Sequence, residues 1–262
     1  MPAPPLRGQP EPVPAPAARR DTPGCRAGKF GVAGVLGLAL FWCAGTVFAQ
    51  LSGTLSVLSD YRYRGISLSD NEPAFQLGLT YDDALGWYAG AFVSTVESAL
   101  YETHGVQAIA FAGYAWRMTS GLTVEAGADY SVVTAAPRFD YTEIYAGFAF
   151  QNITGRVYYS PRYFGSDSPA VYGELNLAQP LQDNIQLLAH IGILGSSAKP
   201  SYYMPYPASS GAVIDGAVGI GMTWQSFNLQ LSWVGVNHAS SAYGVTGTGN
   251  RNGVVASLSY AF

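Results

Sequence analysis

Seven ionisable residues stand at alternate positions in segments of the chain whose other positions are mostly apolar. Carboxylates, a guanidinium and an imidazole on one side of a strand can line a polar passage, or they can pair with one another in a closed interior. Five acids against one arginine would make a passage negative, which favours cations or neutral solutes over anions. Both roles stay open, although packing is favoured for the histidine. The seven lumen-lining candidates are Glu125, Asp129, Glu143, Arg156, Glu174, His190 and Asp215.

Glu125 and Arg156 are the two candidates whose positions suggest a specific contact. Both come a few residues from a short turn, on strands separated by one other strand, which places them about 10 Å apart. Gly147 on the intervening strand has no side chain and would leave room for them to meet. The pattern therefore allows an ion pair.

A second group of charged residues follows the first strand-like segment. Asp60, Arg62 and Arg64 stand two residues apart, so an extended chain would hold them on one side. They could fold inward as a constriction, or they could stay outside and bind lipopolysaccharide phosphates through charge-assisted hydrogen bonds. The outward role is favoured. A later stretch at 196–210, with three tyrosines and three prolines, could form an external surface for sugars or partners, although such loops more often pack on themselves.

Catalytic chemistry has little support in the sequence. His238 and Ser240 form a His-x-Ser arrangement, in which the imidazole could activate the hydroxyl for lipid hydrolysis at a membrane surface. No acid or asparagine beside them completes the constellation. The sequence has no Gly-x-Ser-x-Gly elbow, phosphate-binding loop or cluster of metal ligands, and only three histidines. We therefore expect no catalytic residue, no metal and no cofactor.

The elements that would position these residues follow from a period of two. From Leu51 onward, apolar residues alternate with small or polar ones in segments of about ten residues, the length that a tilted membrane-spanning strand needs. The clearest runs are 122–131 and 227–233. The twelve segments are 51–59, 73–82, 86–95, 105–116, 121–132, 139–150, 153–162, 169–178, 184–195, 211–224, 226–237 and 252–262.

The connections between these segments alternate in length. Short links at 82–86, 117–120, 151–152, 179–183 and 225 alternate with longer ones such as 60–72 and 238–251. Outer-membrane barrels have short periplasmic turns and longer external loops, so both termini would face the periplasm. We predict an all-β fold, a transmembrane antiparallel up-and-down β-barrel of about twelve strands.

Residues 1–49 are predicted to form a leader with a cleavable secretory signal peptide, and 50–262 to form the barrel. Basic residues precede an apolar run at 30–42, and small residues stand before Gln50, where cleavage is expected. The true translation start could lie further along this leader. Both cysteines fall within it, so 50–262 holds no disulfide or thiolate site.

The charge of the remaining chain excludes another class of partner. The leader takes five of the 13 basic and two of the 17 acidic residues, which leaves 8 basic and 15 acidic residues and a formal net charge of −7. A chain this acidic is not expected to bind nucleic acid. Only 11% of all residues are charged, while 31 are glycine and 18 are tyrosine, which suits a barrel with a lipid-facing side.

Aromatic residues gather near the ends of the segments, as expected for two girdles at the membrane surfaces. Those near the short turns are Trp116, Phe150, Trp224 and Phe227. Those near the long loops are Tyr130, Phe139, Tyr163 and Trp233. The final strand places Val254, Ala256, Leu258, Tyr260 and Phe262 on one face. An alternating strand that ends on an aromatic residue is typical of the signal read by the outer-membrane assembly machinery.

Several motifs resemble those of a known family. The most specific is Ser-Asp-Tyr-Arg-Tyr-Arg-Gly-Ile-Ser at 59–67, followed by Pro-Ala-Phe-Gln at 73–76, with further matches at 86–90, 141–147 and 158–161. Together they resemble the TorF-type porins, outer-membrane proteins of largely unassigned function, over most of 50–262. The resemblance implies a barrel and the label of porin, and it implies no particular substrate and no catalytic residues.

These features predict a porin-like narrow channel for small cationic or neutral solutes in the outer membrane of a Gram-negative bacterium, exported by a cleaved N-terminal signal. Its expected partners are outer-membrane lipid and lipopolysaccharide, the assembly machinery through the strand ending at Phe262, and small solutes. Two alternatives remain open. One is a lipid hydrolase at the rim, using Ser240 and His238, and the other is a non-conducting structural or adhesive barrel.

Overall fold

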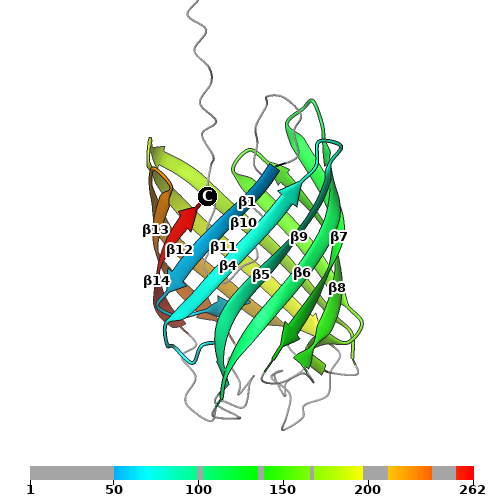
Figure 1. Cartoon of the computed structure of the whole chain (residues 1–262), viewed down its shortest axis with the longest axis vertical. Coiled ribbons are helices and arrows are strands. Elements are labelled where there is room, and N and C mark those ends of the chain that lie inside the picture. The colour runs from blue at the N-terminus through cyan, green and yellow to red at the C-terminus, as the bar shows by residue number, and fades with distance from the viewer. Residues whose placement is uncertain (1–49, 99–102, 135–138, 166–167, 197–211, 238–251) are drawn as a thin grey trace, which may run out of the picture.

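Twelve strands form one closed antiparallel β-barrel in a computed structural model that describes residues 50–98, 103–134, 139–165, 168–196, 212–237 and 252–262 (Figure 1). Each of the twelve predicted segments overlaps one of these strands, so the predicted barrel is confirmed. In chain order the barrel strands are β1 (Gln50–Leu58), β4 (Ala74–Asp82), β5 (Trp87–Ser98), β6 (Thr103–Arg117), β7 (Leu122–Val133), β8 (Tyr141–Phe150), β9 (Ile153–Ser160), β10 (Ala170–Gln182), β11 (Ile185–Ser196), β12 (Val213–Trp224), β13 (Phe227–Val236) and β14 (Asn252–Ala261).

The barrel closes where its first and last strands meet. β1 pairs with β14 in the register Val57↔Leu258, and elsewhere each strand pairs with its neighbours in sequence. Beyond the end of β14, Phe262 and Gly53 exchange two backbone hydrogen bonds of 2.9 and 3.0 Å. The C-terminus therefore lies beside β1, at the upper end of the barrel in Figure 1.

The connections are sorted by length between the two ends of the barrel, as the sequence predicts. The turns at one end span 83–86, 118–121, 151–152, 183–184 and 225–226. One boundary differs from the prediction, because β10 continues through the expected turn at 179–183 to Gln182. Its pairing with β11 shifts between Pro180 and Gln182, where proline offers no N–H to the ladder.

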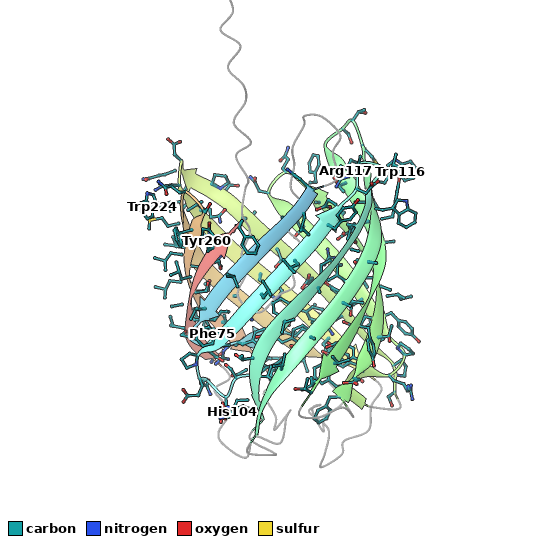
Figure 2. The ribbon with its side chains drawn as sticks, viewed as in Figure 1. Phe75, His104, Trp116, Arg117, Trp224 and Tyr260 are labelled. Carbon is teal, nitrogen blue, oxygen red and sulfur yellow. The ribbon has the colours of Figure 1, made fainter. Side chains whose placement is uncertain are left out.

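The two faces of the strands differ as a membrane barrel requires. Leu229, Leu231 and Leu258 point outward and are 47%, 56% and 49% exposed, and Leu122 lies on the same face as exposed Val124. Figure 2 shows side chains projecting from the outside of the ribbon around the barrel. An apolar exterior of this kind matches hydrocarbon rather than water. Within the described ranges, the chain contains no helix that is long and apolar enough to cross a membrane.

Aromatic girdles are present, with one correction. Trp116 and Trp224 are 65% and 63% exposed and lie at the upper end in Figure 2, beside the short turns. Phe139 and Tyr163, which were expected in the girdle near the long loops, are instead 5% and 3% exposed. They turn into the barrel, where both rings contact Phe164.

The interior of the barrel is packed by side chains and by a segment that does not belong to the wall. Residues 59–73 leave the end of β1 and include a small hairpin of β2 (Arg62–Tyr63) and β3 (Ile66–Ser67). The side chains of Tyr61, Arg62 and Tyr63 are buried. The sequence prediction of a simple external loop here is wrong, and this segment shapes the interior.

Candidate functional site

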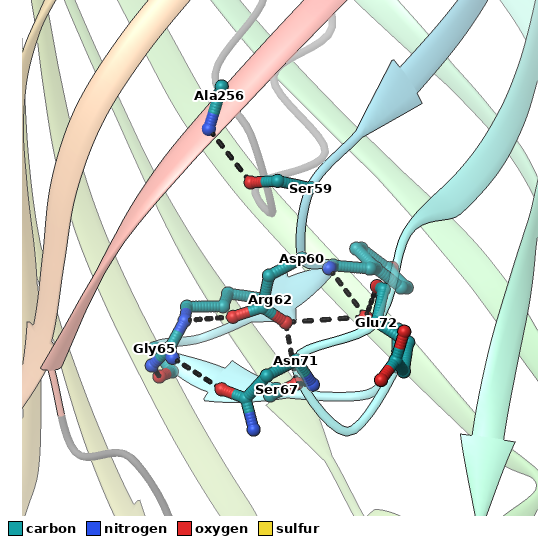
Figure 3. Close-up of polar contacts among 10 residues, drawn as sticks. Ser59, Asp60, Arg62, Gly65, Ser67, Asn71, Glu72 and Ala256 are labelled. Carbon is teal, nitrogen blue, oxygen red and sulfur yellow. Dashed lines mark hydrogen bonds and ion pairs between the residues drawn. The ribbon is translucent and has the colours of Figure 1, made fainter.

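The segment 59–73 enters the barrel directly after β1. Ser59 extends the pairing by one residue, since its N–H donates to the Ala256 carbonyl at 2.9 Å and its Oγ accepts from the Ala256 N–H at 3.0 Å (Figure 3). The chain then reverses at Arg64 and Gly65, which have φ angles of 50° and 78°, as a two-residue hairpin turn requires. A Cβ on Gly65 would lie 2.6 Å from the Asp215 Cβ, so the close approach to β12 also needs glycine.

Asp60 organises this segment. Its carboxylate accepts hydrogen bonds from Arg62 Nε at 2.6 Å, from Ser67 Oγ at 2.6 Å and from Ser69 Oγ at 3.3 Å (Figure 3). The Tyr61 N–H donates to Ser69 Oγ at 2.8 Å. Because these contacts join both arms of the hairpin, the segment forms one compact unit.

Arg64 fixes that unit to the opposite wall. Its Nη1 and Nη2 donate to the two carboxylate oxygens of Glu143 in β8 at 3.1 and 2.6 Å, a two-pronged contact that suits the planar guanidinium. The Arg64 Cζ also lies within 4.2 to 5.1 Å of four ring centroids, those of Tyr63, Tyr158, Tyr163 and Tyr172. Ring faces attract a cation, so the arginine is stabilised although it is removed from water.

The favoured outward role for Asp60, Arg62 and Arg64 is therefore wrong. Their exposed fractions are 5%, 2% and 5%, and each is held inside the barrel. The physical reason is that Glu143 and the tyrosine rings compensate for the loss of water around the charges. Burial tends to lower the pKa of Arg64, but the facing Glu143 carboxylate raises that pKa above its ordinary value. Burial raises the pKa of the Tyr63 phenol, so that it stays neutral.

Glu125 and Arg156 form the ion pair that the sequence allows. Arg156 Nε donates to Glu125 Oε1 at 2.8 Å, and its Nη2 reaches the same oxygen. Tyr88 OH donates to the other oxygen of Glu125 at 2.8 Å. A Cβ on Gly147 would lie 3.0 Å from Glu125 Oε1 and 3.2 Å from Arg156 Cγ, so the glycine provides the room, as predicted.

His190 belongs to a third buried group. Its Nε2 lies 2.8 Å from Asp215 Oδ1, and its Nδ1 lies 2.7 Å from Asn176 Oδ1. Tyr172 OH adds hydrogen bonds of 3.2 and 3.3 Å to the Asp215 carboxylate. Both nitrogens of the imidazole thus face oxygen atoms, an arrangement that holds strands β10, β11 and β12 together from the inside.

Two of the seven candidates make no hydrogen bond to another described residue. Glu174 is 7% exposed, and Asp129 is half-buried opposite Glu143 in the register of β7 and β8. With segment 59–73 inside the barrel, its interior gains Asp60, Arg62 and Arg64, so acids exceed arginines by six to three rather than by five to one. The acidic excess is therefore smaller than the sequence indicates.

Sequence reasoning missed three of the tyrosines that pack this layer. Tyr88, Tyr141 and Tyr63 are each no more than 6% exposed, and Tyr141 OH donates to Tyr63 OH at 2.9 Å. Tyr88 and Tyr141 share the inward face with Glu125 and Glu143, so the period of two could have identified them. Tyr63 lies in the hairpin, whose inward position no local pattern reveals.

Some predicted residues lie outside the described part of the chain. They are His238 and Ser240, the loop at 196–210 beyond Ser196, and the leader at 1–49. The rim hydrolase therefore stays an untested prediction. Within the described ranges, no three His, Cys, Asp or Glu side chains come together in a way that could hold a metal ion.

The comparison with known families assigns the chain. The model of a family described as bacterial protein of unknown function (Gcw_chp) matches residues 44–261. The chain belongs to the Gcw_chp family. No curated protein matches the sequence of this Gcw_chp member.

Solved structures resemble this Gcw_chp barrel at low sequence identity. A NanC porin structure is 10% identical, with 81% of this chain and 99% of that chain covered and a TM-score of 0.50. The KdgM porin is 10% identical, with 82% and 99% covered and a TM-score of 0.48. LpxR from Salmonella typhimurium is 9% identical, with 80% and 99% covered and a TM-score of 0.39. At these identities the likeness concerns the fold, which is that of a porin-like outer-membrane barrel.

Proposed function

We propose that this protein is a porin-like channel of the outer membrane that passes small cationic or neutral solutes through a narrow lumen. The observation that carries the proposal is the division of each strand into two faces, with exposed leucines outside and buried charged residues inside. Ionisable groups at membrane depth persist where they face water, a partner or a pathway. A closed barrel with this interior is suited to conduct polar solutes.

Segment 59–73 narrows the proposed channel. Arg62, Arg64 and Glu143 are 2 to 5% exposed, so little free space remains at their level. Twelve strands enclose less space than the sixteen or more of open aqueous porins, and a folded-in segment reduces it further. In this account, conduction depends on movement of the segment away from Glu143.

The charge of the interior supports the proposed selectivity. Each arginine in the lumen already faces a carboxylate, namely Arg62 with Asp60, Arg64 with Glu143 and Arg156 with Glu125. Asp129 and Glu174 are not neutralised in this way. Net negative charge along a narrow passage attracts cations and repels anions.

The remaining parts of the proposal follow from the sequence. The leader at 1–49 would direct export, the strand ending at Phe262 would engage the assembly machinery, and outer-membrane lipid and lipopolysaccharide would surround the barrel. The motif at 59–67 supports membership among TorF-type porins. The proposal assigns no catalytic residue, metal or cofactor to the chain.

Planar-bilayer recording of the purified protein tests the proposal. We expect discrete conductance steps that are small for a porin, and a reversal potential in a potassium chloride gradient that indicates preference for potassium. A preference for chloride would contradict the proposal that the acids of the lumen determine the ion selectivity. No conductance at any voltage would contradict the channel itself.

The packed interior also favours a second candidate, a barrel that conducts nothing and acts through its outer loops. Buried ion pairs in a closed interior are as suitable for holding strands together as for selecting ions. Bilayer recording distinguishes the two candidates, because a structural barrel would stay silent even after the Arg64–Glu143 contact is removed.

A further inference from the structure

The lumen has two chemically different halves. All seven ionisable candidates lie on the adjacent strands β7 to β12. The inward side chains of the other six strands, among the described residues, are uncharged except for Asp82 and Arg117, which form a pair at the end of the barrel. Charge on the strands themselves is therefore confined to one wall apart from that pair, and the strands of the facing wall offer hydroxyl and amide groups, with the Arg62–Asp60 pair of segment 59–73 lying beside Gly253 of β14.

The uncharged wall carries a continuous row of hydrogen-bonding side chains. Register pairs join one residue from each of β13, β14, β1, β4, β5 and β6, so that neighbours in the row are direct partners across adjacent strands. We call this row the polar track. Its members are Asn228, Ser259, Ser56, Gln76, Ser94 and Gln107.

The polar track runs along the lumen as well as around it. Register rows are perpendicular to the strands, which tilt by about 40° in such barrels and lie about 4.8 Å apart, so five steps climb on the order of 15 Å. Asn228 lies next to Phe227, beside the short turns, whereas Gln107 lies three residues after His104. Figure 2 places Trp224 and His104 at opposite ends of the barrel, and Trp224 stacks on Phe227. The track thus leads from one end toward the other.

The members of the track are connected but keep capacity for further hydrogen bonds. Ser56 Oγ donates to Ser259 Oγ at 2.9 Å, and Gln76 Nε2 donates to Ser94 Oγ at 3.2 Å. Ser56, Gln76 and Ser259 are half-buried, so the protein does not fully cover their polar groups. Hydroxyl and amide groups each donate and accept, which suits a partner that does the same.

A second observation points to a ligand beside the track. Gln230 is 2% exposed, and its Nε2 donates to Asn228 Oδ1 at 2.7 Å, but its buried Oε1 has no hydrogen-bond partner among the described residues. The buried Nε2 of Gln186 has no partner there either. Gly221 stands between them in register and has the Gln186 Nε2 only 3.1 Å from the position of a Cβ. One free acceptor and one free donor therefore flank a residue without a side chain.

We propose that the polar track, together with Gln186 and Gln230, is a binding path for an uncharged polyhydroxylated solute such as a sugar or polyol. The hydroxyl groups of such a molecule can accept from Gln186 Nε2 and donate to Gln230 Oε1, whereas a metal cation offers no acceptor and a halide offers no donor. Neighbouring hydroxyls on such a molecule can exchange partners with Ser259, Ser56 and Gln76 as it advances. The inference rests on the proposed channel and narrows its solutes to the neutral class.

Tyr61 closes the outer part of this path. Its hydroxyl donates to Gln107 Oε1 at 2.8 Å, and Ser94 and Gln107 are both fully buried. The same inward segment that contains Arg64 therefore covers the far end of the track. In this proposal, a solute binds at the short-turn end without movement of segment 59–73. Its passage through the barrel requires that segment to move.

Maltose binding to the full-length protein in detergent micelles, measured by saturation-transfer NMR, tests the inference separately from conduction. We expect transfer to maltose and much weaker transfer to gluconate, whose carboxylate the acidic lumen repels. Gln230→Leu and Gln186→Leu should each weaken maltose binding about fivefold, the effect of one lost hydrogen bond. Gln182→Leu, the same change at an exposed position at the end of β10, should leave it unchanged.

The outcomes separate the two proposals. Conductance without maltose binding overturns the sugar path and leaves the channel intact, whereas maltose binding without conductance supports the path and overturns the channel. Equal binding of gluconate overturns the neutral class. If Gln230→Leu does not fold, the test rests on Gln186→Leu. Maltose binding by that variant equal to binding by the unaltered protein overturns the proposed sugar path.

Discussion

Arg64 and Glu143 face each other inside the barrel through two parallel hydrogen bonds of 3.1 and 2.6 Å, although 79 residues separate them in sequence. This contact joins the segment after the first strand to the opposite wall, near the long-loop end of β8. Because both side chains are buried, separating them leaves each charge without its partner, which costs free energy. The two residues therefore hold segment 59–73 in place and set how open the lumen is.

Removing Glu125 should destabilise the barrel strongly. Glu125→Ala leaves Arg156 buried without its carboxylate, which costs about 3–5 kcal/mol in comparable buried pairs. Urea unfolding in lipid vesicles measures the loss. Glu97→Ala makes the same change at the rim, where the partner His104 is 88% exposed, and should change stability little. Equal effects at both positions would contradict the buried pair.

A charge on the outer face should cost more in the middle of a strand than at its end. Leu231→Arg, on the exterior of β13, should cost about 2–4 kcal/mol at the centre of the bilayer, whereas Leu51→Arg near the short turns should cost at most about 1 kcal/mol. The same unfolding experiment gives both values. No dependence on depth would show that this face does not meet hydrocarbon.

The seam between β1 and β14 depends on a glycine. A Cβ on Gly53 would lie 2.4 Å from the tip of the Phe262 ring, so Gly53→Ala should displace the ring and cost about 1 kcal/mol, the size of an aromatic contact. Gly78→Ala on neighbouring β4 is a matched control, because its Cβ would meet nothing within 4 Å. The stability difference between the two variants checks the packing of Phe262.

The lumen acids that face no arginine should determine ion preference. Asp129→Asn and Glu174→Gln each replace an acid by its neutral amide and should shift the reversal potential in a potassium chloride gradient toward that of an unselective channel. Asp70→Asn changes an exposed aspartate in segment 59–73 and should have little effect. A reversal potential unaltered in the double variant would assign selectivity to other residues.

The regular part of the fold could be predicted from the sequence because it follows from local rules. A period of two assigns each side chain to a face of its strand. The alternation of short and long loops assigns each end of a strand to one end of the barrel. Those rules located all twelve strands, and they brought Glu125 and Arg156 together across Gly147 because the register is direct from β7 to β8 to β9.

The inward segment could not be predicted in the same way. Alternation around Arg62 and Arg64 shows that their side chains share a side, but not whether that side faces the lumen or the outside. The decision depends on Glu143 and on Tyr158, Tyr163 and Tyr172, which come from distant parts of the chain. Gly65 is the local sequence signal for the turn, because its φ of 78° favours glycine, but it does not show whether the hairpin points inward or outward.

The most direct test is the single-channel conductance of Arg64→Ala against that of the unaltered protein and of Arg117→Ala, which removes an arginine from a half-exposed pair at the rim. We expect small conductance steps from the unaltered protein and from Arg117→Ala, and steps several times larger from Arg64→Ala, because the segment is no longer held by Glu143. Identical steps in all three proteins, or silence in all three, would contradict a channel that segment 59–73 narrows.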